Sequence, residues 1–511
     1  VKAYDRITNQ EFNFGIYNVN LLQNDQFIYS MQYDKITWED TKYLYTEKNY
    51  SLARKGAGKY YHLFSHHQNQ SLSFINKKSL PGITINQSGI YNAIIKVRDY
   101  ANNEVNVQVV LSSEIIPKFN YSVNYNNEIC YIQFETEEFR PYFYLTNRYD
   151  TKLHVPADYY EEDNHLFVIN NIKPPLDVVE VYAKNKTGLR SSSSFHVPKS
   201  NHYNNITGKL ILYHYEHGII IKFEETEISG MKAFFTLEKN GDIYHHEFNL
   251  ISGHIHSSSI FSPMDLEHVS EIKVYYENPT PLEIFKMDQW GTVVYPDSAF
   301  NFSLINDQLL ISGQQNTFYD TVYIWAKPVH VEAPLNGMFM SKAFKVQPNL
   351  IPFNKEIQLE IALEEHHFPE HLSIYFYNEK KEEWYYMPSK FNVDSTYIQT
   401  TILSGEIFAI IKEIDPPELS SFIPEINGTY YASDLEHISF HVEDKISGIE
   451  GETDVLMELD GKRVIFEYNS YQKKVRYPLK YDLTEGKHTL YVEATDRVGN
   501  QSVNKGIFFI K

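Results

Sequence analysis

One pattern recurs along this chain and restricts its fold more than any other feature. An alternating apolar segment follows a glycine and leads to an aspartate ten residues after it, with an asparagine four residues further on. The clear copies are residues 89–103, with Asp99 and Asn103, and residues 486–500, with Asp496 and Asn500. Weaker copies occupy residues 178–188 and 271–278. Repetition of one short unit predicts a series of similar domains.

The chemistry of the repeat is that of a β-hairpin. Alternation of apolar and polar residues with period two buries one face of a strand. Aspartate and asparagine close tight turns by hydrogen bonding to nearby backbone, and glycine supplies positive φ. Such an ending is typical of the last hairpin of a β-sandwich. We therefore predict an all-β chain of tandem immunoglobulin-like or fibronectin-like β-sandwich domains, in which Asp99, Asn103, Asp496 and Asn500 shape turns.

Length and proline positions predict where the domains lie. The 511 residues exceed what one core serves, and about 100–150 residues per domain gives four or five domains. Tyrosine and phenylalanine, 41 and 32 residues, suit half-buried strands. Prolines interrupt the pattern near the joints, because proline cannot donate to a β-ladder. We predict an immunoglobulin-like domain with an insertion at residues 1–113, followed by domains at 114–200, 201–284, 285–413 and 414–511.

Charge, cysteine content and hydropathy exclude several classes of protein. The net charge of −20 repels phosphate backbones, so nucleic acid is not an expected partner. The single cysteine, Cys130, leaves no internal disulfide and is expected to be a small buried side chain. No apolar run reaches the roughly 20 residues of a membrane span. The chain begins at Val1 without a signal-peptide pattern, from which we expect a preceding segment to have been removed.

The histidines raise the question of a zinc site. In hydrolases, a catalytic zinc ion has three protein ligands and one open coordination position. His154 and Asp158 have the His-x-x-x-Asp spacing, and His254 and His256 have the His-x-His spacing. Lysostaphin-type (LytM-like) zinc endopeptidases use this combination, but their glycine between the first two ligands is missing here. The two pairs also fall in different predicted domains, so we expect no catalytic residue. The alternative is a hydrolase that assembles these four residues across domains.

Calcium is the better metal candidate. Asp444 opens a short polar loop, and Asp496 and Asn500 stand in the closing turn of the same predicted domain. Oxygen ligands of this kind bind calcium. The alternative is that Asp444, Asp496 and Asn500 only hold turns through their side-chain oxygens.

Beyond this spacing, much of the chain resembles the region behind the catalytic domain in large exported lysostaphin-type peptidases of Bacteroidetes-like and related marine bacteria. At the front, the resemblance is carried by residues 1–6, 15–21, 27–29 and 89–103, together with Tyr43, Tyr50 and Arg54. Towards the end, it is carried by residues 353–359, 384–387, 405–411, 415–417, 444–449, 459–461 and 496–500. The resemblance implies a catalytic zinc domain that precedes Val1, with no cofactor in this chain.

The sequence thus leads to one preferred function and one rival. We expect a non-catalytic region that positions or docks an exported peptidoglycan peptidase at the cell envelope. Its expected location is periplasmic, outer-surface or secreted. Partners would be peptidoglycan, a surface glycan or an envelope protein, bound through Tyr-rich strand faces. The alternative is a cell-surface adhesin or glycan-binding protein without a peptidase.

Overall fold

Strands dominate the computed structural model of the chain, which confirms the all-β prediction. The structure describes all residues except 7–12, 46, 65–71, 77–81, 84, 86, 114–118, 136–138, 148–153, 164, 174–176, 187, 192, 197–207, 216–217, 227–232, 253, 277–282, 287–290, 364–369 and 481–482. Two compact units are present, residues 1–288 with 350–354 and residues 289–349 with 355–511. The longest described helical segments, η1 (Thr41–Tyr45) and α1 (Tyr50–Arg54), have five residues each. None of the described helices has the length and apolar character that crossing a membrane requires.

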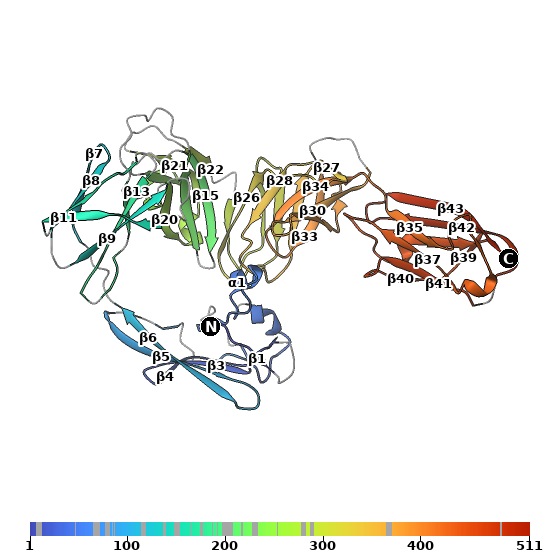
Figure 1. Cartoon of the computed structure of the whole chain (residues 1–511), viewed down its shortest axis with the longest axis horizontal. Helices are drawn as coiled ribbons and strands as arrows, with labels where there is room; N and C mark the ends of the chain where they lie inside the picture. The colour runs from blue at the N-terminus through green and yellow to red at the C-terminus, as the bar shows by residue number, and fades with distance from the viewer. Residues whose placement is uncertain are drawn as a thin grey trace. The chain divides into compact units, whose positions relative to one another are not determined.

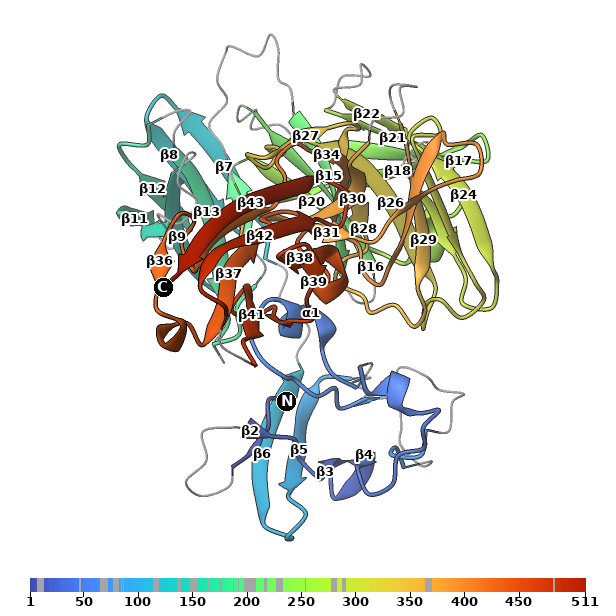
Figure 2. The same cartoon turned by 90° about the vertical axis from the view of Figure 1, so that its right-hand side faces the viewer.

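Residues 1–113 form a four-stranded antiparallel sheet, β4-β3-β5-β6, and a two-stranded one, β1-β2. The strands are β1 (Asp5–Arg6), β2 (Asn13–Phe14), β3 (Asn18–Gln23), β4 (Gln26–Gln32), β5 (Gly89–Arg98) and β6 (Glu104–Ser113); Figure 2 shows β5 and β6 as a long hairpin. Val19 and Met31 from the sheet pack against Tyr61 and Phe74 from the insertion between β4 and β5. In the described part of this domain, the insertion therefore supplies the facing layer.

Residues 114–200 hold two four-stranded sheets, β10-β9-β13-β14 and β11-β12-β8-β7. The strands are β7 (Tyr121–Asn126), β8 (Ile129–Phe134), β9 (Arg140–Asn147), β10 (His154–Pro156), β11 (Tyr159–Asp163), β12 (Leu166–Ile169), β13 (Asp177–Lys184) and β14 (Ser194–His196). Phe134, Phe167 and Val179 share one core with Cys130. Cys130 is fully buried as predicted, and burial raises the pKa of its thiol to about 12.

The third domain repeats this two-sheet plan with sheets β15-β16-β20-β19 and β18-β17-β21-β22. The strands are β15 (Gly208–Tyr215), β16 (Gly218–Glu225), β17 (Phe234–Lys239), β18 (Asp242–Glu247), β19 (Asn249–Ser252), β20 (Ile255–Phe261), β21 (Val269–Tyr275) and β22 (Glu283–Lys286), with η2 (Pro263–Leu266) after β20. Its last strand passes the predicted limit at residue 284 and ends at Lys286.

The fourth domain has larger sheets, which accounts for its greater length. One has the order β23-β26-β28-β34-β30-β31 with β27 beside β34, and the other has the order β24-β25-β29-β33-β32. The strands are β23 (Gly291–Val294), β24 (Phe300–Leu304), β25 (Leu309–Gly313), β26 (Val322–Val329), β27 (Gly337–Phe339), β28 (Ala343–Gln347), β29 (Ile357–Ala362), β30 (Leu372–Asn378), β31 (Glu383–Met387), β32 (Lys390–Phe391), β33 (Tyr397–Ile402) and β34 (Ile407–Glu413).

The last domain, at the orange-to-red end of the chain in Figure 1, is a sandwich of sheets β35-β37-β41-β40 and β36-β43-β42-β38-β39. The strands are β35 (Glu418–Ile423), β36 (Thr429–Tyr430), β37 (His437–Glu443), β38 (Val455–Leu459), β39 (Lys462–Arg463), β40 (Glu467–Asn469), β41 (Lys474–Pro478), β42 (Gly486–Thr495) and β43 (Gln501–Ile510), with η4 (Ala432–Asp434) and η5 (Glu452–Asp454). Phe440, Val475, Val492 and Phe508 from both layers form its core.

The repeated turn has the same hydrogen bonds in both clear copies. Between β5 and β6, the Asn103 backbone N–H donates to Asp99 Oδ1 over 2.8 Å, and its side-chain amide donates to Oδ2 over 2.6 Å. Between β42 and β43, Asn500 makes the same two bonds to Asp496, each 2.8 Å long. In the third copy, Asn185 Oδ1 accepts from the N–H of Leu189 over 2.8 Å. These contacts confirm the predicted turns; the fourth copy ends outside the described residues.

Candidate functional site

The structure brings two of the three calcium candidates together with a carboxylate that the sequence analysis missed. Asp444, Asp496 and Glu413 each contribute one oxygen to a group whose atoms lie within 4.8 Å of one another. Glu413 and Asp496 are buried, and Asp444 is half-buried. Among the residues that the structure describes, this carboxylate trio is the one such group of three or more His, Cys, Asp or Glu side chains.

Each member of the carboxylate trio is held by its own local structure. Glu413 ends β34, and the Tyr375 hydroxyl donates to its Oε2 over 3.3 Å. Asp444 follows β37, and its Oδ1 accepts from the backbone N–H groups of Ile446 and Gly448. Asp496 is held by the turn between β42 and β43. The positions of the carboxylates are therefore determined by backbone and buried partners.

The trio lies where the fourth domain meets the fifth. His371 Nδ1 lies 3.1 Å from the carbonyl oxygen of Val498, in the turn that contains Asp496. The Arg497 guanidinium stands 5.5 Å from the ring centroid of Tyr386. Ile446, from the Asp444 loop, packs against the buried cluster of the fourth domain. These contacts join the two loops of the last domain to the end of the preceding one.

Burial and the charges of neighbouring carboxylates oppose ionisation of Glu413 and Asp496. Burial raises the pKa of Glu413 to about 8, with further contributions from the charges of Asp444 and Asp496. Burial also raises the pKa of Asp496, against the hydrogen bonds from Asn500 that lower it. Low dielectric and like charges disfavour the charged form of a carboxyl group. Near neutral pH, Glu413 therefore favours its protonated form unless a cation offsets the neighbouring charges.

The oxygen chemistry of the trio fits a hard cation. Calcium takes six to eight oxygen ligands at about 2.3–2.6 Å, so two oxygens on one ion lie no more than about 5 Å apart. The ligand oxygens of the trio, which all lie within 4.8 Å of one another, satisfy this condition. The third candidate, Asn500, turns its amide nitrogen towards Asp496, 2.8 Å away. The exposed Asp99–Asn103 turn makes the same hydrogen bond. Closing the turn is therefore enough to explain the conformation of Asn500.

The zinc candidates lie in different domains. His154 begins β10 of the second domain, and its side chain lies outside the described part; exposed Asp158 follows that strand. His254 and His256 lie at β20 of the third domain. Buried His256 places Nε2 2.7 Å from Glu225 Oε1, which also accepts from the Tyr276 hydroxyl. His256 is thus engaged in a buried hydrogen-bond network.

A pocket of about 510 Å³ in the third domain carries the histidine pair of β18. Phe234, His245, His246, Glu247, Tyr275 and Tyr276 line it. His245 Nδ1 lies 2.8 Å from the Tyr275 hydroxyl, whereas His246 stacks on buried Phe235 with ring centroids 5.0 Å apart. Burial, with the neighbouring His245, lowers the pKa of His246. The two rings serve different partners, as expected for neighbours on a strand.

The fold defines the chain as an all-β protein of tandem immunoglobulin-like domains. No family model matches the sequence, and no curated protein matches it. Solved structures that resemble parts of it include one described as "Structural insight into host cell surface retention of a 1.5-MDa bacterial ice-binding adhesin", at 8% identity and a TM-score of 0.12 over 75% of this chain and 91% of that one. Another comprises Sidekick-1 immunoglobulin domains 1–5, at 9% identity and a TM-score of 0.15 over 98% and 93%. At such scores these likenesses carry no functional argument.

Proposed function

We propose that this chain is the non-catalytic, multi-domain region of an exported lysostaphin-type peptidase, and that it positions or docks the enzyme at the cell envelope. The resemblance carried by short segments between residues 1 and 103 and between residues 353 and 500 supports the peptidase link. The contacts between the fourth and fifth domains support the proposed positioning role. There the loop contacts of His371, Arg497 and Ile446 restrain neighbouring sandwiches, as a spacer requires.

The side chains available for catalysis support the same proposal. In the described residues, His256 is engaged with Glu225, and the carboxylate trio itself contains no histidine. A zinc hydrolase needs converging ligands with an open position.

The test combines zinc analysis with peptidoglycan assays on the purified chain. We expect no stoichiometric zinc and no chelator-sensitive release of peptides from peptidoglycan, with an active lysostaphin-type peptidase as the positive control. We also expect the chain to sediment with isolated cell envelopes. Hydrolysis that a chelator abolishes would refute the non-catalytic assignment, and a chain that stays in the supernatant would refute docking.

The rival function is a cell-surface adhesin or glycan-binding protein without a peptidase. The same consecutive β-domains would serve it, because the first, second, fourth and fifth have hydrophobic cores of their own. The gene sequence directly before Val1 separates the two. A His-x-x-x-Asp element with an internal glycine there supports the peptidase, and a signal peptide alone supports the adhesin.

A further inference from the structure

The outer face of one sheet in the second domain has an unusual composition. Strands β9 and β13 pair with Lys184 opposite Arg140, Tyr182 opposite Tyr142, and Glu180 opposite Tyr144. The intervening residues, such as Phe143 and Val181, belong to the core between the sheets. An outer face is ordinarily a mixture of small polar and charged residues. This one carries three tyrosines beside a group of cations.

The cations form a row across three chain segments. Lys184 is the bridge partner of Arg190 on its other side, so Arg140, Lys184 and Arg190 stand side by side. Like charges directly opposite each other destabilise a sheet. Within the described residues, neither Arg140 nor Lys184 has a carboxylate within 4.0 Å; both lie over the Tyr142 ring, 5.6 Å and 4.9 Å from its centroid. Arg140 and Lys184 therefore place two positive charges, with no described carboxylate close to either, on a chain of net charge −20.

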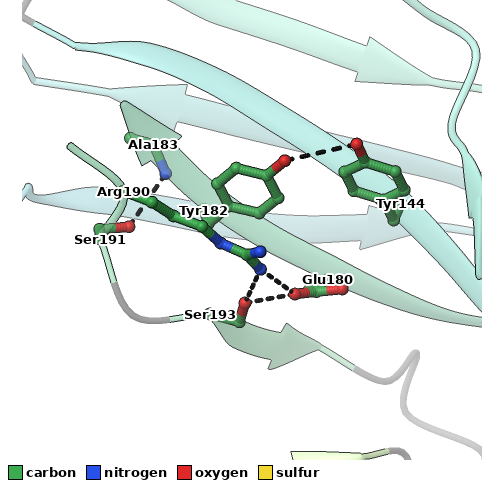
Figure 3. Close-up of polar contacts among 7 residues, drawn as sticks. All are labelled: Tyr144, Glu180, Tyr182, Ala183, Arg190, Ser191 and Ser193. Atoms are coloured by element: carbon green, nitrogen blue, oxygen red, sulfur yellow. Dashed lines mark hydrogen bonds and ion pairs between the residues drawn. The ribbon is translucent and has the colours of Figure 1, made fainter. Parts of the chain in front are cut away.

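Arg190 is held in place by a small network that Figure 3 shows. Its Nη2 lies 2.9 Å from Glu180 Oε1 and 2.7 Å from Ser193 Oγ. The guanidinium carbon stands 3.7 Å from the ring centroid of Tyr182. Glu180 is buried, whereas the Arg190 side chain is 48% exposed. The network holds Arg190 while about half of its side chain stays exposed.

The tyrosines form a continuous layer beside the row. Tyr142 and Tyr182 are stacked with centroids 5.1 Å apart, and Tyr144 and Tyr182 are stacked at 5.7 Å. The Tyr182 hydroxyl donates to that of Tyr144 over 3.3 Å. Tyr142 and Tyr144 are half-buried and reach the surface. Amphipathic aromatic rings of this kind offer apolar area and hydroxyl groups to a ligand.

We infer that this face, defined by Arg140, Tyr142, Tyr144, Lys184 and Arg190, binds a polysaccharide built from uronic acids. A uronic acid carries its carboxylate on the sugar ring, so the ring contacts tyrosine while the carboxylate meets the adjacent cations. Arginine and lysine bind carboxylates through charge-assisted hydrogen bonds. A long polyphosphate is a poorer match, because it has no sugar ring to contact the tyrosines, and the cations alone would have to bind it against the net charge of the whole chain. The inference rests on the docking role proposed above and names its ligand class.

The experiment measures binding of the full chain to polygalacturonate, with neutral dextran as the comparison. We expect saturable binding to the uronate polymer that weakens as salt rises, and none to dextran. The substitutions Arg140→Gln and Lys184→Gln should each lower the affinity about tenfold, because each removes a charge-assisted bond. Tyr142→Ala should lower it as well, whereas Tyr142→Phe should retain most of it. Unchanged circular dichroism would show that the variants fold.

The matched control is Lys222→Gln in the third domain. Lys222 lies 4.3 Å from the ring centroid of Tyr213, so it makes the same contact outside the row, and its substitution should leave affinity unchanged. Equal losses in Lys184→Gln and Lys222→Gln would overturn the site. Stronger binding to single-stranded DNA or to purified peptidoglycan than to polygalacturonate would overturn the ligand. If the parent chain does not bind polygalacturonate, while Arg140→Gln and Lys184→Gln still sediment with cell envelopes, this inference is refuted and the docking role stands.

Discussion

Replacing Glu413 with glutamine should stabilise the second unit of the chain in the absence of divalent cations. Glutamine keeps the shape of the side chain and an oxygen that accepts from the Tyr375 hydroxyl, which now donates over 3.3 Å. The substitution removes one of three ionisable groups from the buried trio. Because Asp444 and Asp496 remain, the turn and loop that they hold are unchanged.

Two estimates give the size of this effect. The pKa of Glu413 is raised from 4.5 to about 8 by burial and by its neighbours. At pH 7 the folded chain thus keeps a proton that the unfolded chain releases, which costs about 3 kcal/mol at 1.36 kcal/mol per pH unit. Alternatively, two ionised carboxylates no more than 4.8 Å apart repel by roughly 3 kcal/mol or more at an effective dielectric constant near 20. The free energy of unfolding should rise by up to this amount.

The assay is urea unfolding at pH 7 in EDTA and in calcium chloride, with exposed Glu418→Gln, from the next strand along the chain, as the control. In EDTA, Glu413→Gln should be the more stable protein, and the control should match the parent chain. If the trio binds calcium, the ion should stabilise the parent chain as ligand binding requires, and the variant should lose most of this response. A variant less stable than the parent in EDTA would refute the repulsion argument.

Three further predictions concern other domains. Burial raises the pKa of Glu47 to about 7, although the hydrogen bond from the Tyr29 hydroxyl and the charge of His62 lower it. The stability of the first domain should therefore fall by about 3 kcal/mol as pH rises from 4.5 to 7, and urea unfolding of Glu47→Gln should show a weaker pH dependence. Cys130 should not react with a thiol reagent at pH 8 until guanidinium unfolds the chain, since its thiol is buried and its pKa is about 12; rapid reaction of the native chain would contradict the buried placement. Asp496→Ala should cost about 1–3 kcal/mol in thermal or chemical unfolding, because the turn loses its hydrogen bonds from Val498 and Asn500; an unchanged midpoint would show that the turn does not depend on Asp496.

Local chemistry made the repeated turns predictable. Asp99 and Asp496 bond to residues that lie four positions away or nearer, so the sequence itself contains both partners. The predicted domain limits also followed from local signals, namely prolines and the ends of alternating segments. The first domain differs from the expected sandwich because its insertion contributes Tyr61 and Phe74 to the core, and no periodic pattern marked these residues as a facing layer.

The sequence alone determined the β-class, the series of domains and the turns, because strand alternation and Asp or Asn turns depend on neighbours along the chain. Only the tertiary structure placed Glu413 beside Asp444 and Asp496, although a carboxylate that ends the apolar run of β34 was a signal for it. Likewise, the row of Arg140, Lys184 and Arg190 exists only in the register that pairs their strands. Residues distant in sequence meet only where sheet register and domain packing bring them together, and a one-residue shift in register would separate them.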